Sequence, residues 1–118
     1  MLDYVNFHPE VEDLGEWILQ SMLAACQKMG VRIVHSHVEK FDGTESPEGF
    51  ASVVLIDESH VSAHCYSNEG LLALDAFTCG AHNPSEIIAY LDSAIHTICP
   101  EVEQINRHDV ERFLHRGE

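Results

Sequence analysis

The sequence predicts a single α/β domain, a two-layer sandwich in which helices cover one face of an antiparallel sheet. Two segments carry apolar residues at helical spacing, several short segments are rich in β-forming residues, and turn residues separate neighbouring segments. The chain has 118 residues, 45% of them hydrophobic, which suits one domain over residues 1–118 with its own core. Short turns between the central strand segments predict hairpins, and hairpin strands pair antiparallel.

The first half of the chain predicts a helix, a strand and a loop. Residues 13–29 carry apolar side chains every three or four positions, Glu12 or Asp13 can cap the first turn, and Gly30 suits the left-handed position after the last. Residues 31–39 are rich in β-branched side chains, which predicts a strand with imperfect alternation. In this strand, Ile33 would share a face with His35 and His37. Residues 42–49 are rich in Gly, Pro and acidic residues, which predicts a loop.

The second half predicts three strands, a helix and a short final strand. The strand segments, the last two joined by a turn, are residues 50–56, 60–66 and 71–78. Asn83 or Ser85 can cap a helix that Pro100 ends. The expected apolar face of that helix consists of Ile87, Tyr90, Leu91, Ala94 and Ile98. Residues 101–105 suggest a short strand, and residues 109–116 suggest a last turn or two of helix.

Charge and hydropathy narrow the classes of function. The 20 acidic residues outnumber the 6 basic ones, giving a formal net charge of −14, which argues against nucleic-acid binding. Such an excess is typical of a solvated surface, and it would also suit a cationic substrate. No apolar run approaches the roughly 20 residues that a membrane-spanning helix needs. Because no secretory signal is recognisable at the N-terminus, we expect a cytoplasmic protein without a membrane partner.

Cysteines and histidines give no metal or disulfide signature. The four cysteines form no CxxC pair, so we expect free thiols. Nine histidines are present, and two pairs of them could each share one face of a strand. These pairs are His35 with His37 and His60 with His64. Neither pair has a cysteine or acidic partner at the usual ligand spacing, so the sequence predicts no metal site.

Ser59 follows the apolar run 53–56 and stands between Glu58 and His60. A serine hydroxyl can attack the carbonyl of the preceding residue, and the resulting ester can eliminate and hydrolyse to a pyruvoyl group. That reaction requires a strained turn, a base and stabilisation of an oxyanion. Taken alone, the same three residues would also fit a strand end whose polar groups satisfy local hydrogen bonds.

The wider pattern around Ser59 resembles the pyruvoyl-dependent S-adenosylmethionine decarboxylases. His64 follows the serine by five residues, and residues 75–80 read Asp-Ala-Phe-Thr-Cys-Gly, with Cys79 twenty residues after the serine. These are the residue types and intervals of the family. The resemblance extends from the first predicted helix through Pro100.

This resemblance implies a self-processing carboxy-lyase. The chain would cut itself between Glu58 and Ser59, and Ser59 would become a covalent pyruvoyl cofactor. His64 would assist processing by removing the α-proton of the serine, and Cys79 would protonate the product after carbon dioxide leaves. The implied function is decarboxylation of S-adenosylmethionine for spermidine biosynthesis, by a homodimer of cleaved protomers.

The chain departs from the family pattern where the substrate would bind. Where the family runs Thr-Trp-Pro-Glu after the histidine, this chain has residues 65–68, Cys-Tyr-Ser-Asn. Asn68 stands in place of the carboxylate that holds the ribose hydroxyls, and the neighbouring Glu69 can substitute for it. Tyr66, Asn68 and Glu69 are therefore the expected substrate-binding residues.

Two further family positions differ. Glu45 stands where an aromatic residue stacks on adenine, which leaves Phe41 or Phe50 for that role. Ala51 stands where a serine assists processing, with Ser52 beside it as a replacement.

These departures leave two other functions open. A pyruvoyl-dependent arginine or ornithine decarboxylase of the same fold would keep Ser59, His64 and Cys79 and discard the nucleoside contacts. Glu45 and Glu69 would then suit the distal cation of the amino acid. The other alternative is an uncleaved, non-catalytic homologue with a regulatory or partner-binding role.

Overall fold

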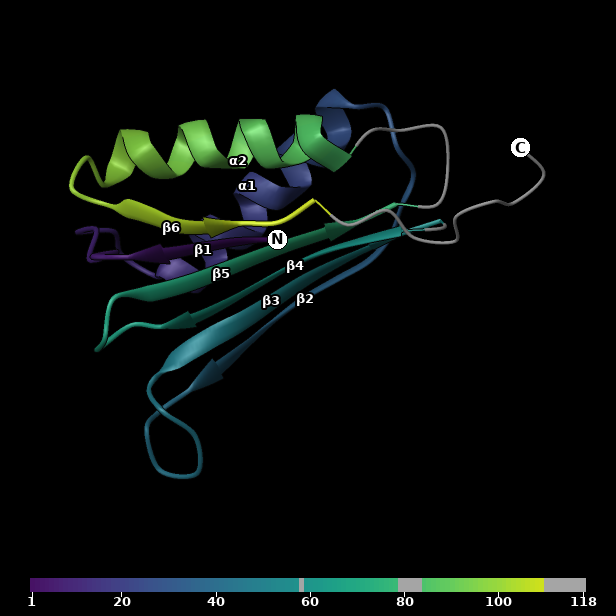
Figure 1. Cartoon of the computed structure of the whole chain (residues 1–118). Coiled ribbons are helices and arrows are strands. Elements are labelled where there is room, and N and C mark those ends of the chain that lie inside the picture. Colours follow the sequence, from purple (N-terminus) through teal and green to yellow (C-terminus); the bar gives the residue numbers. More distant parts are fainter. Residues whose placement is uncertain (58, 79–83, 110–118) are drawn as a thin grey trace.

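The computed structural model describes residues 1–57, 59–78 and 84–109 of the chain. Six strands form one antiparallel sheet in the order β2-β3-β4-β5-β1-β6, and two helices accompany it (Figure 1). In chain order the elements are β1 (Leu2–Val5), α1 (Leu14–Lys28), β2 (Ile33–Phe41), β3 (Gly49–Ile56), β4 (Ser59–Tyr66), β5 (Leu71–Phe77), α2 (Pro84–Ile98) and β6 (Glu103–Arg107). This is the predicted antiparallel α/β sandwich.

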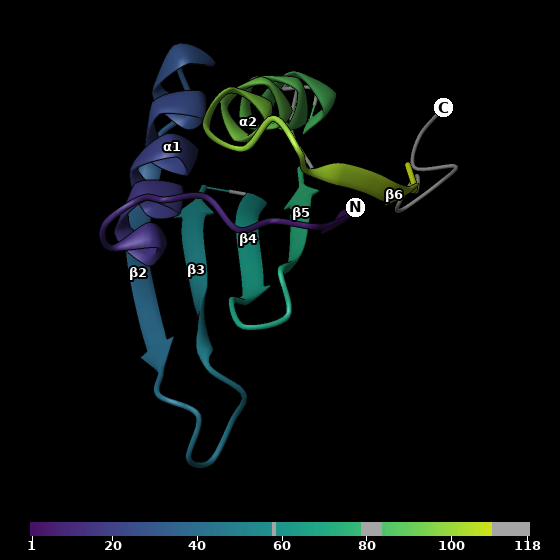
Figure 2. The same ribbon diagram turned by 90° about the vertical axis from the view of Figure 1, so that its left-hand side faces the viewer.

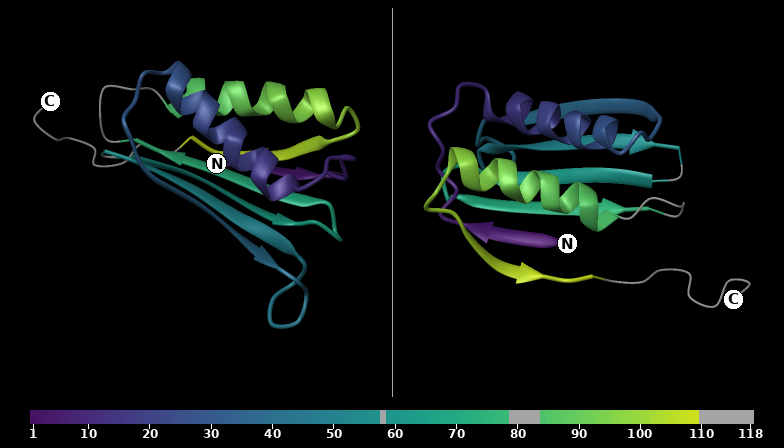
Figure 3. Two further views of the ribbon diagram at one scale, coloured as in Figure 1. Left: turned by 180° about the vertical axis from the view of Figure 1, so that it is seen from behind. Right: turned by 90° about the horizontal axis from the view of Figure 1, so that it is seen from above.

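Both helices lie on one face of the sheet. Helix α1 packs on β2 and β3, and α2 packs on β5 and against α1 (Figure 2). The view from above shows α1 and α2 side by side over the sheet, whereas β6 lies beyond them at the edge of the sheet (Figure 3). Within the described part of the chain, the opposite face carries no helix. We call it the open face.

The core fills the space between the sheet and the two helices. Its largest fully buried side chains are Tyr4, Phe7, Leu2, Ile18, Met22, Leu72, Leu74, Ile87, Leu91, Ile95, Val54 and Val61. Helix α1 begins as predicted, because the Asp13 carboxylate accepts a hydrogen bond from the Glu16 amide at 3.4 Å. It is followed by Gly30 at φ 73°, the left-handed conformation that glycine adopts without steric cost.

Strand β1 was not among the predicted strands. Its four residues pair with β5 on one side and β6 on the other, which places them inside the sheet. Leu2 and Tyr4 are each 1% exposed, whereas the alternate positions are partly exposed. Two buried side chains in a four-residue segment are too short a pattern for a periodicity argument, so only the pairing reveals the strand.

Strand β2 corrects the predicted faces. The prediction put Ile33 on the same face as His35, but the register shifts between them. Ile33 pairs with Ile56, on the helix side, and His35 pairs with Leu55, on the open face. A bulge of this kind changes which face the following side chains occupy, which explains the imperfect alternation in the sequence.

The C-terminal elements also differ in detail from the prediction. Tyr90 is 37% exposed, and Ile88 takes part in the buried face of α2 in its place. Strand β6 begins at Glu103 and all its residues are exposed. Most of the helix expected at residues 109–116 lies outside the described residues. Among the described helices, none combines the length and the apolar character needed to cross a bilayer.

Candidate active site

Ser59 stands at the tight end of a central hairpin. It begins β4 and pairs with Ile56, the last residue of β3, so only positions 57 and 58 separate the two strands. The pairing puts Ser59 on the helix-covered side, at the end of the sheet, where it is half-buried. Glu58, the other half of the predicted cleavage site, lies outside the described residues.

The end of β5 lies beside this hairpin. Phe77 pairs with His60, and their rings lie 5.4 Å apart between centroids. The predicted acid, Cys79, follows Phe77 by two residues in the sequence and lies outside the described residues.

An ion pair at the hairpin turn was missed by sequence reasoning. Arg32 Nη1 lies 2.5 Å from Asp57 Oδ1. The two residues are 25 positions apart, and only the pairing of the start of β2 with the end of β3 brings them together. Nothing in the sequence spacing signals the contact.

His64 is separated from Ser59 within the chain. It pairs with Ala51 on β3 and Ala73 on β5, and its exposed imidazole lies on the open face. Side chains five residues apart on a strand point to opposite faces and lie roughly 16 Å apart along it. One copy of the chain therefore does not bring His64 to the serine hydroxyl.

The three predicted substrate-binding residues lie at the other end of β4. Tyr66 ends the strand on the open face and is 43% exposed. Asn68 and Glu69 are exposed in the following turn, where the Glu69 amide donates to the Tyr66 carbonyl at 3.1 Å. Seven strand residues separate this end from Ser59, roughly 23 Å. Within one chain these residues are near each other but far from the serine.

The structure also places the substitutes considered for the altered family positions. Phe50 is 4% exposed and Ser52 is 2% exposed, both packed under the helices. The Ser52 hydroxyl donates to the Gly15 carbonyl at 3.4 Å, on the opposite face from Ala51. Ser52 therefore does not occupy the space that a serine at position 51 would fill. Phe41 remains half-buried on the open face.

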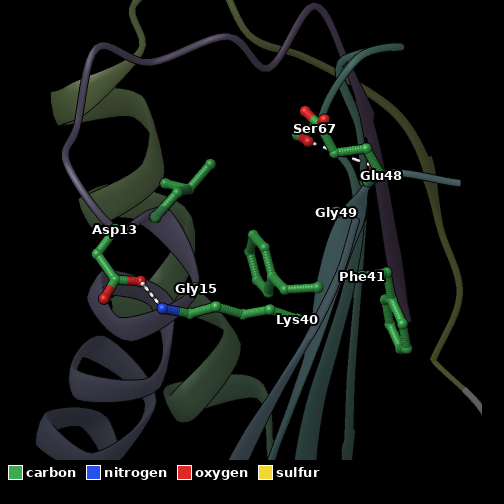
Figure 4. A pocket seen from close by; sticks show the side chains of 9 residues that line it. Asp13, Gly15, Lys40, Phe41, Glu48, Gly49 and Ser67 are labelled. Carbon is green, nitrogen blue, oxygen red and sulfur yellow. Dashed lines mark hydrogen bonds and ion pairs between the residues drawn. The ribbon is translucent and has the colours of Figure 1, made fainter. Parts of the chain in front are cut away.

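A cavity of about 420 Å³ opens near the start of α1, where β2 ends and β3 begins (Figure 4). It is lined by Asp13, Leu14, Gly15, Lys40, Phe41, Glu48, Gly49, Phe50 and Ser67. Lys40 Nζ reaches the Asp13 carboxylate at 2.8 Å, and the Ser67 hydroxyl donates to the Glu48 carbonyl at 3.3 Å (Figure 4). This cavity lies at the opposite end of β3 from Ser59, and neither Ser59 nor His64 lines it.

Four histidines share the open face. His35, His37, His60 and His64 all occupy positions that pair across that face. His37 Nε2 lies 2.9 Å from a carboxylate oxygen of Glu39. Among the residues that the structure describes, no three His, Cys, Asp or Glu side chains are grouped so as to hold a metal ion.

The described cysteines are buried free thiols. Cys26, Cys65 and Cys99 are at most 3% exposed. Burial raises the pKa of the Cys65 thiol to about 12 and also raises the pKa of the Cys26 thiol. Both thiols therefore remain protonated near neutral pH and act as small apolar side chains.

Comparisons with known proteins agree with this architecture. The solved adenosylmethionine decarboxylase from Aquifex aeolicus superposes with a TM-score of 0.58 at 23% identity, covering 98% of this chain and 93% of that one. The two proteins thus share the same two-layer α/β fold. The sequence model described as S-adenosylmethionine decarboxylase matches residues 1–108. This chain belongs to the S-adenosylmethionine decarboxylase family.

Individual relatives support the same assignment. The S-adenosylmethionine decarboxylase proenzyme of Thermococcus kodakarensis is 33% identical over 111 residues, which are 91% of this chain and 75% of that protein. The proenzyme of Thermococcus onnurineus is 32% identical over 111 residues, 91% of this chain and 76% of the relative. The proenzyme of Brevibacillus brevis is 35% identical over 82 residues, 69% of this chain and 59% of its own length.

Proposed function

We propose that this chain is a self-cleaving, pyruvoyl-dependent decarboxylase of S-adenosylmethionine that serves spermidine biosynthesis. The observation that carries the proposal is the family match over residues 1–108, which includes Ser59, His64 and Cys79 at the family's intervals. The position of Ser59 at the end of a tight hairpin supports it, because a backbone break there leaves both strands within the sheet.

Self-cleavage needs only groups of this chain and one water molecule. The Ser59 hydroxyl adds to the Glu58 carbonyl, the C–N bond breaks, and the serine nitrogen takes the proton as the ester forms. His64 then removes the α-proton of residue 59, and the Glu58 carboxylate leaves with the C–O electron pair. The resulting dehydroalanine tautomerises to an imine, and water releases ammonia to leave the pyruvoyl group.

The surroundings of Ser59 fit this group. Its half-buried position at the end of the sheet allows water to reach the residue. The ketone of a pyruvoyl group binds the substrate amine and accepts the electron pair released with carbon dioxide. Cys79 would then supply the proton that replaces the carboxylate. Tyr66, Asn68 and Glu69 would contact the remainder of the substrate.

A homodimer reconciles these roles with the geometry. Ser59 and His64 lie on opposite faces of the sheet and roughly 16 Å apart, so His64 would act on the serine of a second copy. Because Ser59 faces the helix-covered side, the partner's His64 would have to reach it around the hairpin end of the sheet. On the open face, Leu55 is 41% exposed and Tyr66 is 43% exposed, and a partner would bury this apolar surface. The functional unit would be a cytoplasmic dimer of cleaved protomers, with an amino-acid-type small molecule as substrate.

Release of labelled carbon dioxide from carboxyl-labelled substrates tests the proposed activity. S-Adenosylmethionine should be decarboxylated, whereas arginine and ornithine should not. The matched control is Ser59→Ala, which should release no carbon dioxide from any of the three. Release from arginine or ornithine alone would overturn the proposed substrate. A purified wild-type protein that is inactive on all three would favour the non-catalytic alternative.

A further inference from the structure

A salt bridge ties the proposed cleavage turn to the start of the edge strand β2. Arg32 Nη1 lies 2.5 Å from Asp57 Oδ1. Asp57 directly precedes Glu58, whose carbonyl carbon the serine hydroxyl would attack. The contact exists because the start of β2 pairs with the end of β3. A residue distant in sequence therefore places a positive charge one residue from the scissile bond.

The fold itself gains little from this ion pair. The two side chains are 75% and 49% exposed, and exposed ion pairs contribute little to stability. Yet the whole chain has only 6 basic residues against 20 acidic ones. One of these few cations stands beside a turn whose two residues, Asp57 and Glu58, are both acidic. An effect on the reaction at the turn accounts for this placement better than an effect on folding.

The chemistry of the turn supplies that effect. When the Ser59 hydroxyl adds to the carbonyl of Glu58, negative charge develops on the carbonyl oxygen. An unpaired carboxylate on the adjoining residue would repel this charge and raise the barrier. Arg32 neutralises the Asp57 carboxylate and holds it at the side of β2.

We propose that Arg32 is a positioning residue for self-cleavage, which it assists by neutralising and holding the Asp57 carboxylate. This inference rests on the proposed self-cleavage at Ser59. If the Asp57 carboxylate and the charge developing on the carbonyl oxygen of residue 58 are taken to be roughly 6–7 Å apart, their repulsion at an effective dielectric constant of about 40 to 80 changes the rate about three- to tenfold. Loss of Arg32 should therefore slow cleavage by that factor and not abolish it.

Cell-free synthesis followed by a chase gives the cleavage rate of each newly made precursor, read as fragments 1–58 and 59–118. Arg32→Ala should cleave about three- to tenfold more slowly than wild type at low salt, and added salt should narrow the difference. Asp57→Asn should cleave at or above the wild-type rate, because Arg32 is then an unpaired cation beside the turn. The double variant Arg32→Ala/Asp57→Asn should cleave near the wild-type rate, because positions 32 and 57 then carry no charge. Arg32→Lys should also cleave near that rate.

Lys40→Ala is the matched control. It breaks an ion pair of similar exposure, that of Lys40 with Asp13, at the opposite end of β3. This variant should cleave at the wild-type rate, and a slowing equal to that of Arg32→Ala would overturn the inference. So would an Arg32→Ala precursor that cleaves normally, or a double variant as slow as Arg32→Ala. A wild-type precursor that never cleaves would instead refute the proposed function.

Discussion

A mixed-dimer experiment tests the proposal that each cleavage site needs two copies of the chain. The variants Ser59→Ala and His64→Ala, each expected to be inactive as a pure protein, are produced together in equal amounts. If His64 serves the serine of its partner, a mixed dimer has one complete site. That site combines Ser59 from the His64→Ala chain with His64 from the Ser59→Ala chain.

The expected fraction of processed chains follows from the geometry of one chain and from random pairing of the two variants. Because roughly 16 Å and the thickness of the sheet separate the two side chains within one copy, a single chain contributes no complete site. Equal amounts of two chains form about half mixed dimers, each with one complete site of two. About half of the His64→Ala chains should therefore be processed, and activity should reach about a quarter of wild type.

The assay is intact mass spectrometry of the co-produced protein, with an affinity tag on one variant to tell the two chains apart. The expected product is a pyruvoyl-blocked fragment 59–118 that derives only from the His64→Ala chain. Each variant produced alone is the control. Ser59→Ala lacks the attacking hydroxyl and should give none of this fragment, and His64→Ala should give little, since loss of a general base slows a step about 100-fold or more. If co-production restores no processing, the shared site is wrong.

Three further predictions concern stability. Tyr4→Phe removes the hydrogen bond that the buried hydroxyl donates to Asp92 at 2.5 Å. The free energy of unfolding should therefore fall by about 1–2 kcal/mol and the Tm by about 4–8 °C. An unchanged Tm in a thermal melt would contradict this. Burial raises the pKa of the Cys65 thiol to about 12, so the unfolded chain loses that proton first and stability should fall as the pH rises from about 9 toward 12. Urea unfolding of Cys65→Ala should show a shallower fall, and an identical slope would assign it to other groups. Gly30→Ala forces a left-handed conformation on alanine at φ 73°, which should cost about 1 kcal/mol in the same urea assay although no atom lies within 4 Å of the added methyl group.

The parts of the fold that were predictable are those with long or strong local patterns. Helix α1 has a capping Asp13, an apolar stripe and a terminal Gly30, and each of these signals acts within a few residues. The central hairpins are marked by turn residues and β-branched runs. By contrast, β1 and the bulge in β2 depend on pairing with strands distant in sequence, and no local pattern carries that information.

The candidate site was predictable only as far as spacing along the chain could identify it. The intervals from Ser59 to His64 and Cys79 resemble those of the S-adenosylmethionine decarboxylases. The family match over residues 1–108 then showed that the chain belongs to this family. The structure was needed to place Ser59 and His64 on one strand, β4, whose alternation puts them on opposite faces of the sheet. The Arg32–Asp57 ion pair likewise depends on a contact between distant strands, which explains why no motif in the sequence indicates it.

Intact mass measurement of the freshly purified wild-type chain is the most direct test of the central claim, that the chain makes its own cofactor. Two polypeptides, residues 1–58 with a free carboxyl end and residues 59–118 with a pyruvoyl cap, are the predicted result. Ser59→Ala should give one unbroken chain of 13.2 kDa, allowing for the lost oxygen atom. A wild-type protein that also remains one unbroken chain would contradict the claim.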